Sequence, residues 1–442
     1  LLFVRMDTKH QTVIGLLVLS FVIGYFAVEI DVDTYKAIFQ NMNSEQKEKI
    51  FAAIHSRISQ PESTLTCDEL FCNDPDCGKN VTQLITSKGY PCEQHYALTS
   101  DGYWLSMQRI PYGRNENSTT SGKPIVFLQH GLLDASHTWV INMPAESFGF
   151  ILADHGFDVW MGNNRGNTYS DTNENYSYDD NDFWNFSWDE MASIDLPTQI
   201  DYALGYTGQK QLFYVGHSEG TTQAFSGFQN TALASKVKLF VALAPVAYVG
   251  DITTDFLQTL AFLHIDTILE IIGWNKFLVQ HCWLDNLLDL TCDVDTGAIC
   301  QVAMCAVAGC NPDNINATRY DIYMQLDPAG TSVQNINHWG QMVRQNNFCK
   351  YDFLTRHENE KHYNQAHPPC YDLSLMAAPV ALFSGGKDKL GDPTDVSRLI
   401  SELNPSVIKY STEIDYYEHM DFVWGLDAST VLYPEIISLF KQ

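Results

Sequence analysis

The middle of the chain alternates between short apolar runs and longer segments in which apolar and polar residues mix. The near-continuous apolar runs predict strands buried on both faces, and the mixed segments predict the helices between them. The predicted strands are PIVFLQH, FDVWMGN, QLFYVGH and LFVALAPVA, and the predicted helices are ESFGFILADHG, DLPTQIDYALGYTG and EGTTQAFSGFQ. This alternation predicts an α/β fold with a mostly parallel central sheet covered by helices on both faces.

Two further patterns extend this prediction. Before the first buried strand, QHYALTSDGYWLSMQRIP alternates in polarity around an Asp-Gly turn, which predicts a β-hairpin. Near the C-terminus, APVALFSGGKD and SVIKYSTEIDYYEH restore the strand pattern, and VLYPEIISLFKQ predicts a closing helix. Between about 251 and 371 the chain is helical, aromatic and cysteine-rich without a clear strand. That change predicts an insertion between two halves of the sheet.

The N-terminal residues predict export. The run 12–28 is apolar and uncharged but shorter than the roughly 20 residues that span a membrane, so it suits the apolar core of a secretory signal peptide. Ala27 is a candidate end of the cleavage site, and an uncleaved anchor is the alternative. We therefore expect the secretory pathway, with a secreted or lysosomal protein and no stable transmembrane anchoring.

The predicted organisation has five parts. They are a signal peptide with extra upstream residues (1–28), an N-terminal segment with a cysteine cluster (29–95), the first part of the α/β core (96–250), a cap or lid insertion (251–371) and the second part of the core (372–442). With 442 residues, 45% of them hydrophobic, the chain can bury a large core. Its net charge of −27 repels phosphate backbones, so we expect no nucleic-acid partner. Solubility or an acidic lumen would each account for this acidity.

Cysteines and glycosylation sequons agree with export. The chain has 11 cysteines, which is many for a protein held in a reducing compartment. Four of them form an N-terminal cluster of Cys67, Cys72, Cys77 and Cys92. Their spacing, without a nearby HxxxH pattern, favours disulfides over zinc and leaves the pairing open. Candidate glycosylation sites are Asn80, Asn117, Asn175, Asn185 and Asn316.

The sequence Gly216-His217-Ser218-Glu219-Gly220 places a serine between two glycines, after a predicted strand and before a predicted helix. This is the pattern of a nucleophile elbow, in which a sharp turn exposes a reactive serine and the glycines prevent backbone clashes. The five residues alone also occur by chance as a simple tight turn. The strand and helix around them favour Ser218 as a nucleophile.

A serine nucleophile needs a base, an acid that orients the base, and donors for the oxyanion. On α/β-hydrolase folds the acid and then the histidine follow late strands. Asp388 after VALFSGG is the predicted acid and His419 after the last predicted strand is the predicted base, while Asp392 and Asp395 are competitors for the acid.

The predicted oxyanion donors are the backbone N–H groups of Leu132, in the loop after FLQHG, and of Glu219, which follows the nucleophile. His130 is predicted to organise that loop, and His217 points away from the serine. We expect no metal and no other cofactor, because His362 and His367 have no acidic partner at metal spacing.

The sequence resembles the acid lipases that include gastric and lysosomal acid lipase, from roughly residue 89 to the C-terminus. The resemblance is carried, in order, by YPCEQHYALTSDGYWLSMQRIP, GKPIVFLQHGLL, ADHGFDVWMGNNRGNTYS, FWNFSWDEMASIDLP, GHSEGTT, DPAGTSVQNINHW, SGGKDKLGDPTDV and HMDFVWG. It implies an α/β-hydrolase core with a cap, hydrolysing triacylglycerols or cholesteryl esters at a lipid–water interface. It also implies Ser218 as nucleophile, Asp388 as acid and His419 as base, with the oxyanion donors at Leu132 and Glu219.

Where the family usually has glutamine, this chain has Glu219. A carboxylate aimed at the oxyanion would oppose its charge, so the side chain must either turn to a partner or be protonated. The extra cysteines leave cap shape and substrate size open. Two alternative functions also remain, an esterase or thioesterase acting on smaller soluble esters and a catalytically inactive lipid-binding protein.

Overall fold

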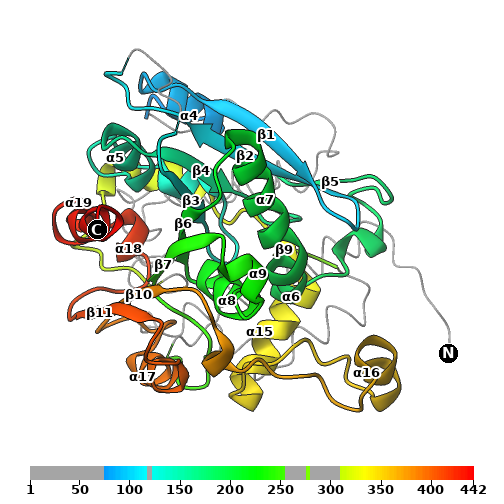
Figure 1. Ribbon diagram of the computed structural model, residues 1–442. Helices are drawn as coiled ribbons and strands as arrows, with labels where there is room; N and C mark the ends of the chain where they lie inside the picture. Colours follow the sequence, from blue (N-terminus) through cyan, green and yellow to red (C-terminus); the bar gives the residue numbers. More distant parts are fainter. Residues whose placement is uncertain (1–73, 117–121, 254–274, 279–308) are drawn as a thin grey trace, which may run out of the picture.

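The computed structural model describes residues 74–116, 122–253, 275–278 and 309–442 (Figure 1). The predicted signal peptide, Cys67, Cys72 and Asn117 lie outside the described residues, as do two long stretches of the predicted insertion.

A nine-stranded sheet forms the centre of the molecule, in the order β1-β2-β4-β3-β6-β7-β10-β11, with β5 paired to β2 (Figure 1). The strands are β1 (Glu93–Leu98), β2 (Tyr103–Ile110), β3 (Ile125–Gln129), β4 (Asp158–Gly162), β5 (Thr172–Asn173), β6 (Leu212–His217), β7 (Val237–Leu243), β10 (Val380–Gly385) and β11 (Ile408–Ile414). Neighbours from β4 to β11 are parallel, whereas β1 and β2 form an antiparallel hairpin. The predicted α/β class, mostly parallel sheet and hairpin are therefore confirmed.

Helices surround the sheet. They are α4 (Val81–Ser87), α5 (Phe148–Asp154), α6 (Trp188–Glu190), α7 (Leu196–Thr207), α8 (Glu219–Gly227), α9 (Thr231–Ala234), α14 (Tyr320–Leu326), α15 (Val333–Gln345), α16 (Arg356–Tyr363), α17 (Pro393–Glu402), α18 (Asp421–Trp424), α19 (Ala428–Val431) and α20 (Tyr433–Phe440). The helices predicted from the polarity pattern correspond to α5, α7, α8 and α20.

Alternate side chains of the central strands pack into two separate hydrophobic cores. In β6, Phe213 and Val215 belong to the core that includes residues of α5, α18 and α20. Leu212 and Tyr214 belong to the core that includes residues of α7, α8 and α17. Since successive side chains of a strand point to opposite faces, both faces of the sheet are covered, which explains the near-continuous apolar runs.

The chain leaves the sheet after β7 and returns to it at β10, the parallel neighbour of β7. The described residues between these strands contain α14, α15 and α16. Contrary to the prediction that this region has no strand, β8 (Lys276–Phe277) and β9 (Thr331–Ser332) form an antiparallel ribbon. Each strand has only two residues, which is too short for an alternation of polarity to be visible in the sequence.

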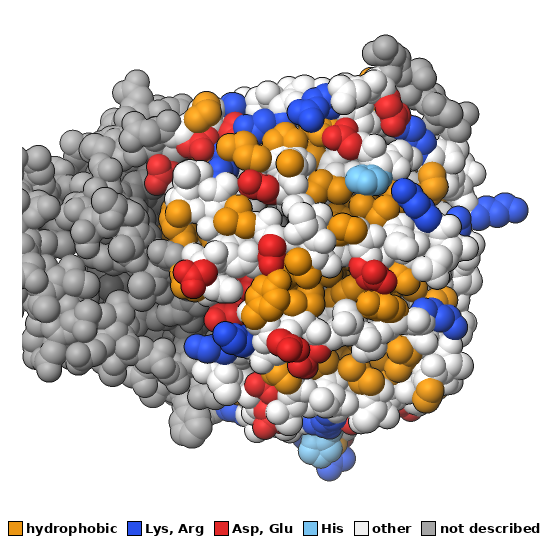
Figure 2. All heavy atoms as spheres, turned by 90° about the vertical axis from the view of Figure 1, so that its left-hand side faces the viewer, with side chains coloured by type: hydrophobic (Ala, Val, Ile, Leu, Met, Phe, Trp, Pro, Cys, Tyr) orange, Lys and Arg blue, Asp and Glu red, His pale blue; other side chains and the backbone are white. Residues whose placement is uncertain are grey.

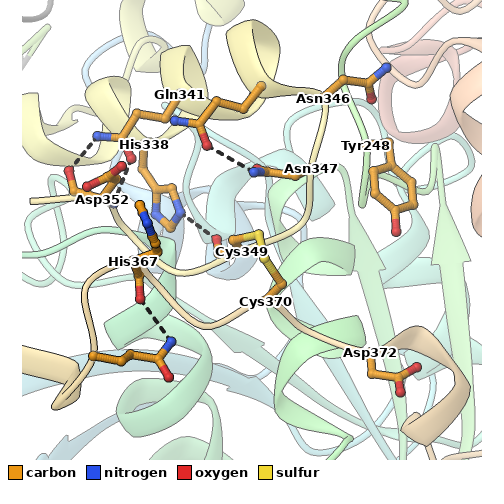
Figure 3. Close-up of a disulfide and its surroundings, with 12 residues drawn as sticks. Tyr248, His338, Gln341, Asn346, Asn347, Cys349, Asp352, His367, Cys370 and Asp372 are labelled. Atoms are coloured by element: carbon orange, nitrogen blue, oxygen red, sulfur yellow. Dashed lines mark hydrogen bonds between the residues drawn. A yellow bond between two sulfur atoms is a disulfide. The ribbon is translucent and has the colours of Figure 1, made fainter. Parts of the chain in front are cut away.

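Helix α15 is linked to its surroundings through His338, which is buried. Beyond its C-terminal end, Cys349 and Cys370 form a disulfide (Figure 3). His338 of α15 contacts the carbonyl oxygen of Cys349 through Nε2 (2.9 Å) and the Ser187 hydroxyl through Nδ1 (3.0 Å). Its ring stacks on Trp188 with 4.3 Å between the ring centres. Burial lowers the pKa of His338 to about 4, so this histidine is a neutral packing residue.

The N-terminal cysteine cluster is only partly disulfide-bonded. Cys77 is in a disulfide, as is Cys310, but Cys92 is a free thiol, so the disulfides favoured for the cluster do not include Cys92. Cys92 lies just before β1, where its thiol is beside the Thr82 side chain and the backbone of Glu93. Burial raises the pKa of this thiol to about 11, which keeps it protonated.

The face of the molecule seen in Figure 2 carries apolar side chains interspersed with acidic and basic ones. Within the described ranges, no helix is both long enough and apolar enough to cross a membrane.

Candidate active site

Ser218 lies in a tight turn between β6 and α8. Its backbone has φ 53° and ψ −119°, outside the regions that residues with a Cβ prefer. A Cβ at Gly216 would lie 2.6 Å from the Gly220 carbonyl oxygen, and a Cβ at Gly220 would lie 2.6 Å from the Gln129 carbonyl oxygen. Both glycines are therefore required for the backbones to pass each other. This is the strained strand-to-helix turn that exposes a serine hydroxyl at the end of a parallel sheet.

Ser218, His419 and Asp388 form one hydrogen-bonded chain. The Nε2 atom of His419 is 2.8 Å from the Ser218 hydroxyl oxygen. Its Nδ1 atom is 2.9 and 3.0 Å from the two carboxylate oxygens of Asp388. Asp388 follows β10 and His419 follows β11, and because these strands are parallel neighbours, both residues reach the same end of the sheet as Ser218.

Asp388 is buried and ionised. Burial alone would raise its pKa, but His419 and the backbone N–H groups of Leu390 and Gly391 (both 2.8 Å) outweigh burial, so the pKa lies below its usual value. The two competing aspartates have other partners. Asp392 accepts from the N–H of Thr394 at the start of α17, and Asp395 accepts from the N–H of Asp251.

The loop after β3 passes next to the serine. A Cβ at Gly131 would lie 3.1 Å from the Ser218 Cβ, so a larger residue there would press against the serine. Leu133 in the same loop has a positive φ of 61°. Among the described residues, no hydrogen-bond acceptor is paired with the backbone N–H of Leu132 or of Glu219.

The Glu219 side chain turns away from this loop and is buried. Its Oε2 accepts from the Asn335 amide and from the Trp339 indole N–H, both at 2.8 Å. Its Oε1 accepts from the Asn164 amide at 3.3 Å. Burial raises the pKa of Glu219, and donors that include Trp339 and Asn335 offset part of that rise. Of the two arrangements considered from the sequence, the structure has the carboxyl group turned to partners.

Two neutral histidines support the site. His130 binds the Gly131 carbonyl through Nδ1 (2.8 Å), and its Nε2 accepts from the backbone N–H of Asn164 (3.1 Å). His217 points away from Ser218, with Nε2 3.0 Å from the His419 carbonyl oxygen. Burial lowers the pKa of each to about 3.

Asn164, Asn335 and Trp339 were not found by sequence reasoning. They come from the loop after β4 and from α15, far from the serine in the sequence. The sequence gives only a weak indication that they are buried, namely the polar residues of GNNRGN and NINHW beside apolar runs. Such residues are as typical of solvent-exposed turns and helix faces as of a buried site.

Three of the five candidate glycosylation sites, Asn80, Asn175 and Asn185, are exposed. Asn316 is half-buried and its amide donates to Glu146. His362 stacks on Phe353 with 3.7 Å between the ring centres.

Comparisons with known proteins agree with this geometry. One family model, a partial alpha/beta-hydrolase lipase region, matches residues 81–143, and another, the alpha/beta hydrolase fold, matches residues 124–426. The chain is 43% identical to the gastric triacylglycerol lipase of Homo sapiens over 85% of this chain and 94% of that protein. It is 44% identical to the lysosomal acid lipase/cholesteryl ester hydrolase of Homo sapiens over 84% of this chain and 92% of that protein.

Among solved structures, a soluble variant of monoglyceride lipase from Saccharomyces cerevisiae aligns with a TM-score of 0.44 and 16% identity, covering 80% of this chain and 94% of that chain. The family predicted from the sequence blocks is confirmed by the sequence matches, which run through the elbow and the late strands. The chain belongs to the family of α/β-hydrolases that contains the gastric and lysosomal acid lipases.

Proposed function

We propose that this chain is a lipase that hydrolyses the ester bonds of neutral lipids through an acyl-enzyme on Ser218. The observation that carries the proposal is the hydrogen-bonded chain from Ser218 through His419 to Asp388, at the end of the parallel sheet. It supports Ser218 as nucleophile, His419 as base and Asp388 as the residue that orients and stabilises the imidazolium.

In the first step, His419 Nε2 removes the proton of Ser218 while Oγ attacks the ester carbonyl carbon. The carbonyl oxygen becomes negative and accepts hydrogen bonds from the backbone N–H groups of Leu132 and Glu219, which have no other partner among the described residues. His419 then gives the proton to the departing alcohol, leaving the acyl group on Ser218. Water, deprotonated by His419, releases the fatty acid and restores the serine.

The proposed substrate class rests on sequence similarity to named relatives. Relatives over 40% identical are named a triacylglycerol lipase and a cholesteryl ester hydrolase, so we propose triacylglycerols or cholesteryl esters at a lipid–water interface. The aromatic residues of 251–371 are proposed to form a cap over an acyl-sized cleft. The names of the relatives also support a secreted or lysosomal location. A cleaved signal peptide within 1–28 and glycosylation at exposed sequons are proposed from the sequence alone.

The test is Ser218→Ala, assayed on an emulsified long-chain triacylglycerol and on a short soluble nitrophenyl ester. We expect the substitution to lower kcat by about 10⁴-fold or more on both substrates, because the nucleophile is removed. Ser226→Ala is the matched control, since Ser226 lies buried on α8 and hydrogen-bonds only to carbonyls of its own helix. Parent activity restricted to the soluble ester would favour the esterase alternative, and a parent without turnover would favour a lipid-binding protein.

A further inference from the structure

One histidine and two aspartates form a buried cluster that the catalytic chain does not use. His137 lies on the helical turn Ser136–Trp139, Asp134 precedes it in the loop after β3, and Asp327 follows α14. The side chains of His137 and Asp134 are 1% and 9% exposed, and that of Asp327 is 17% exposed. One candidate ligand atom from each residue lies within 4.8 Å of the other two.

The distances suit a shared cation. His137 Nε2 is 3.0 Å from both carboxylate oxygens of Asp327 and 3.6 Å from Oδ1 of Asp134. Zinc binds imidazole nitrogen and carboxylate oxygen at about 2.0–2.2 Å, so two ligands separated by angles of about 90–120° lie about 3.0–3.6 Å apart. The spacing around His137 Nε2 therefore matches that of neighbouring ligands on one ion.

In this cluster the carboxylates also outnumber the imidazole. Two carboxylates face one imidazole, and no lysine or arginine in the described part of the chain contacts any of the three residues. Asp134 is buried, yet its Oδ2 has no hydrogen-bond partner. A divalent cation would balance both carboxylates while the imidazole stays neutral.

We propose that Asp134, His137 and Asp327 bind a divalent transition-metal ion such as Zn²⁺, with water completing its coordination. One nitrogen and two carboxylate oxygens are a ligand set that Zn²⁺ accepts. The ion would join the loop after β3 to the segment before β9, which already meet where the Ala329 N–H donates to the Leu133 carbonyl oxygen (2.6 Å). The sequence prediction included no metal, and Asp327 lies 190 residues from His137, so no local spacing marks this site.

The ligands must be deprotonated to bind a metal, so affinity should fall when the solution is acidified. The test is calorimetric titration of the full, chelator-treated protein with Zn²⁺ at about pH 7.5 and about pH 5, together with the visible absorption of added Co²⁺. We expect one saturable site at the higher pH that weakens at the lower pH. His137→Gln and Asp327→Asn should each weaken it at least about 10-fold, because a ligand matters no less than its supporting partners.

His155→Gln is the matched control, because His155 is an exposed histidine whose ring contacts only the carbonyl oxygen of Ile151. It should leave the titration unchanged. Asp327→Asn keeps the size of a half-buried side chain, and so tests the site even if His137→Gln fails to fold. Absence of saturable Zn²⁺ binding by the parent at pH 7.5, or equal binding by the parent and Asp327→Asn, would overturn the proposal and leave a proton-bridged ion cluster.

Discussion

Glu219 is adjacent to the proposed nucleophile, yet its side chain forms hydrogen bonds with the loop after β4 and with α15. Its backbone N–H is a proposed oxyanion donor, whereas its carboxyl group is held by Asn164 from the loop after β4 and by Asn335 and Trp339 from α15. The described residues place no cation in contact with it. A buried carboxyl group bound only by neutral donors depends on each of them, because a lost donor leaves part of its charge unpaired.

We therefore expect Trp339→Phe to destabilise the parent more than it destabilises Glu219→Gln. The difference should be about 1–3 kcal/mol near pH 7.5, because hydrogen bonds to a charged group are stronger than those to a neutral amide. A double-mutant cycle measured by urea unfolding gives this coupling energy. As a control, Trp184→Phe should be additive with Glu219→Gln, since the Trp184 indole donates to Tyr178 instead. Additivity of Trp339→Phe as well would show that this contact contributes little.

Sequence reasoning identified Ser218, Asp388 and His419 because each directly follows a predicted strand, and the ends of parallel strands meet at one edge of a sheet. The partners of Glu219 could not be predicted in the same way, since Asn335 and Trp339 follow no strand of the central sheet. Their contact with Glu219 depends on how α15 lies against α8, which cannot be predicted from a local sequence pattern.

At the scale of elements, the position of α15 depends on the loop closed by Cys349 and Cys370. This disulfide joins residues 21 apart, and His338 ties the Cys349 carbonyl to α15 (Figure 3). We expect the double substitution Cys349→Ser and Cys370→Ser to lower the free energy of unfolding by about 3 kcal/mol, chiefly because the open loop gains entropy in the unfolded state.

Guanidinium unfolding of the parent and the double variant measures this loss. Cys92→Ser is the matched control, because Cys92 is a half-buried free thiol and closes no loop. A double variant as stable as the parent would contradict a stabilising role for the disulfide.

Elements of regular length were predictable, while short ones and covalent links were not. β3 and β6 have every residue buried and so appear as apolar runs, and the hairpin of β1 and β2 was marked by its Asp-Gly turn. The ribbon of β8 and β9 could not be predicted, because a strand of two residues is too short to show an alternation of apolar and polar side chains. The sequence could not tell that Cys92 is the free thiol of its cluster, because disulfides require proximity in space, which spacing along the chain does not give.

At the scale of the whole molecule, the chain is strongly acidic, with a net charge of −27. Its folding stability depends on buried groups that respond to pH in opposite directions. Burial raises the pKa of Asp395 to about 6 and of Asp421 to about 7. It lowers the pKa of His130 and His217 to about 3. The raised carboxyl groups favour the folded state in acid, whereas the buried neutral histidines favour it near neutrality. The overall pH dependence is a balance, so single groups are best seen in differences between variants.

Asp421, the first residue of α18, offers such a difference. Its Oδ2 accepts from the Glu418 N–H (2.8 Å), its Oδ1 is buried without a hydrogen-bond partner, and the neighbouring Glu418 and Asp427 add like charge. The folded pKa of about 7 lies above the unfolded value of about 3.9, so between these values the folded state binds more protons than the unfolded state. The contribution of Asp421 to stability is therefore complete below about pH 4 and declines as the pH rises toward 7.

Asp421→Asn removes this titration. We expect the stability of the variant relative to the parent to increase steadily from about pH 4 to about pH 7 and to level off above that range. Urea unfolding of the variant and the parent at a series of pH values measures the difference. A flat difference for Asp421→Asn would mean that Asp421 ionises in the folded protein as readily as in the unfolded chain. A rising difference would identify one of the groups that fit this strongly acidic chain to an acidic environment.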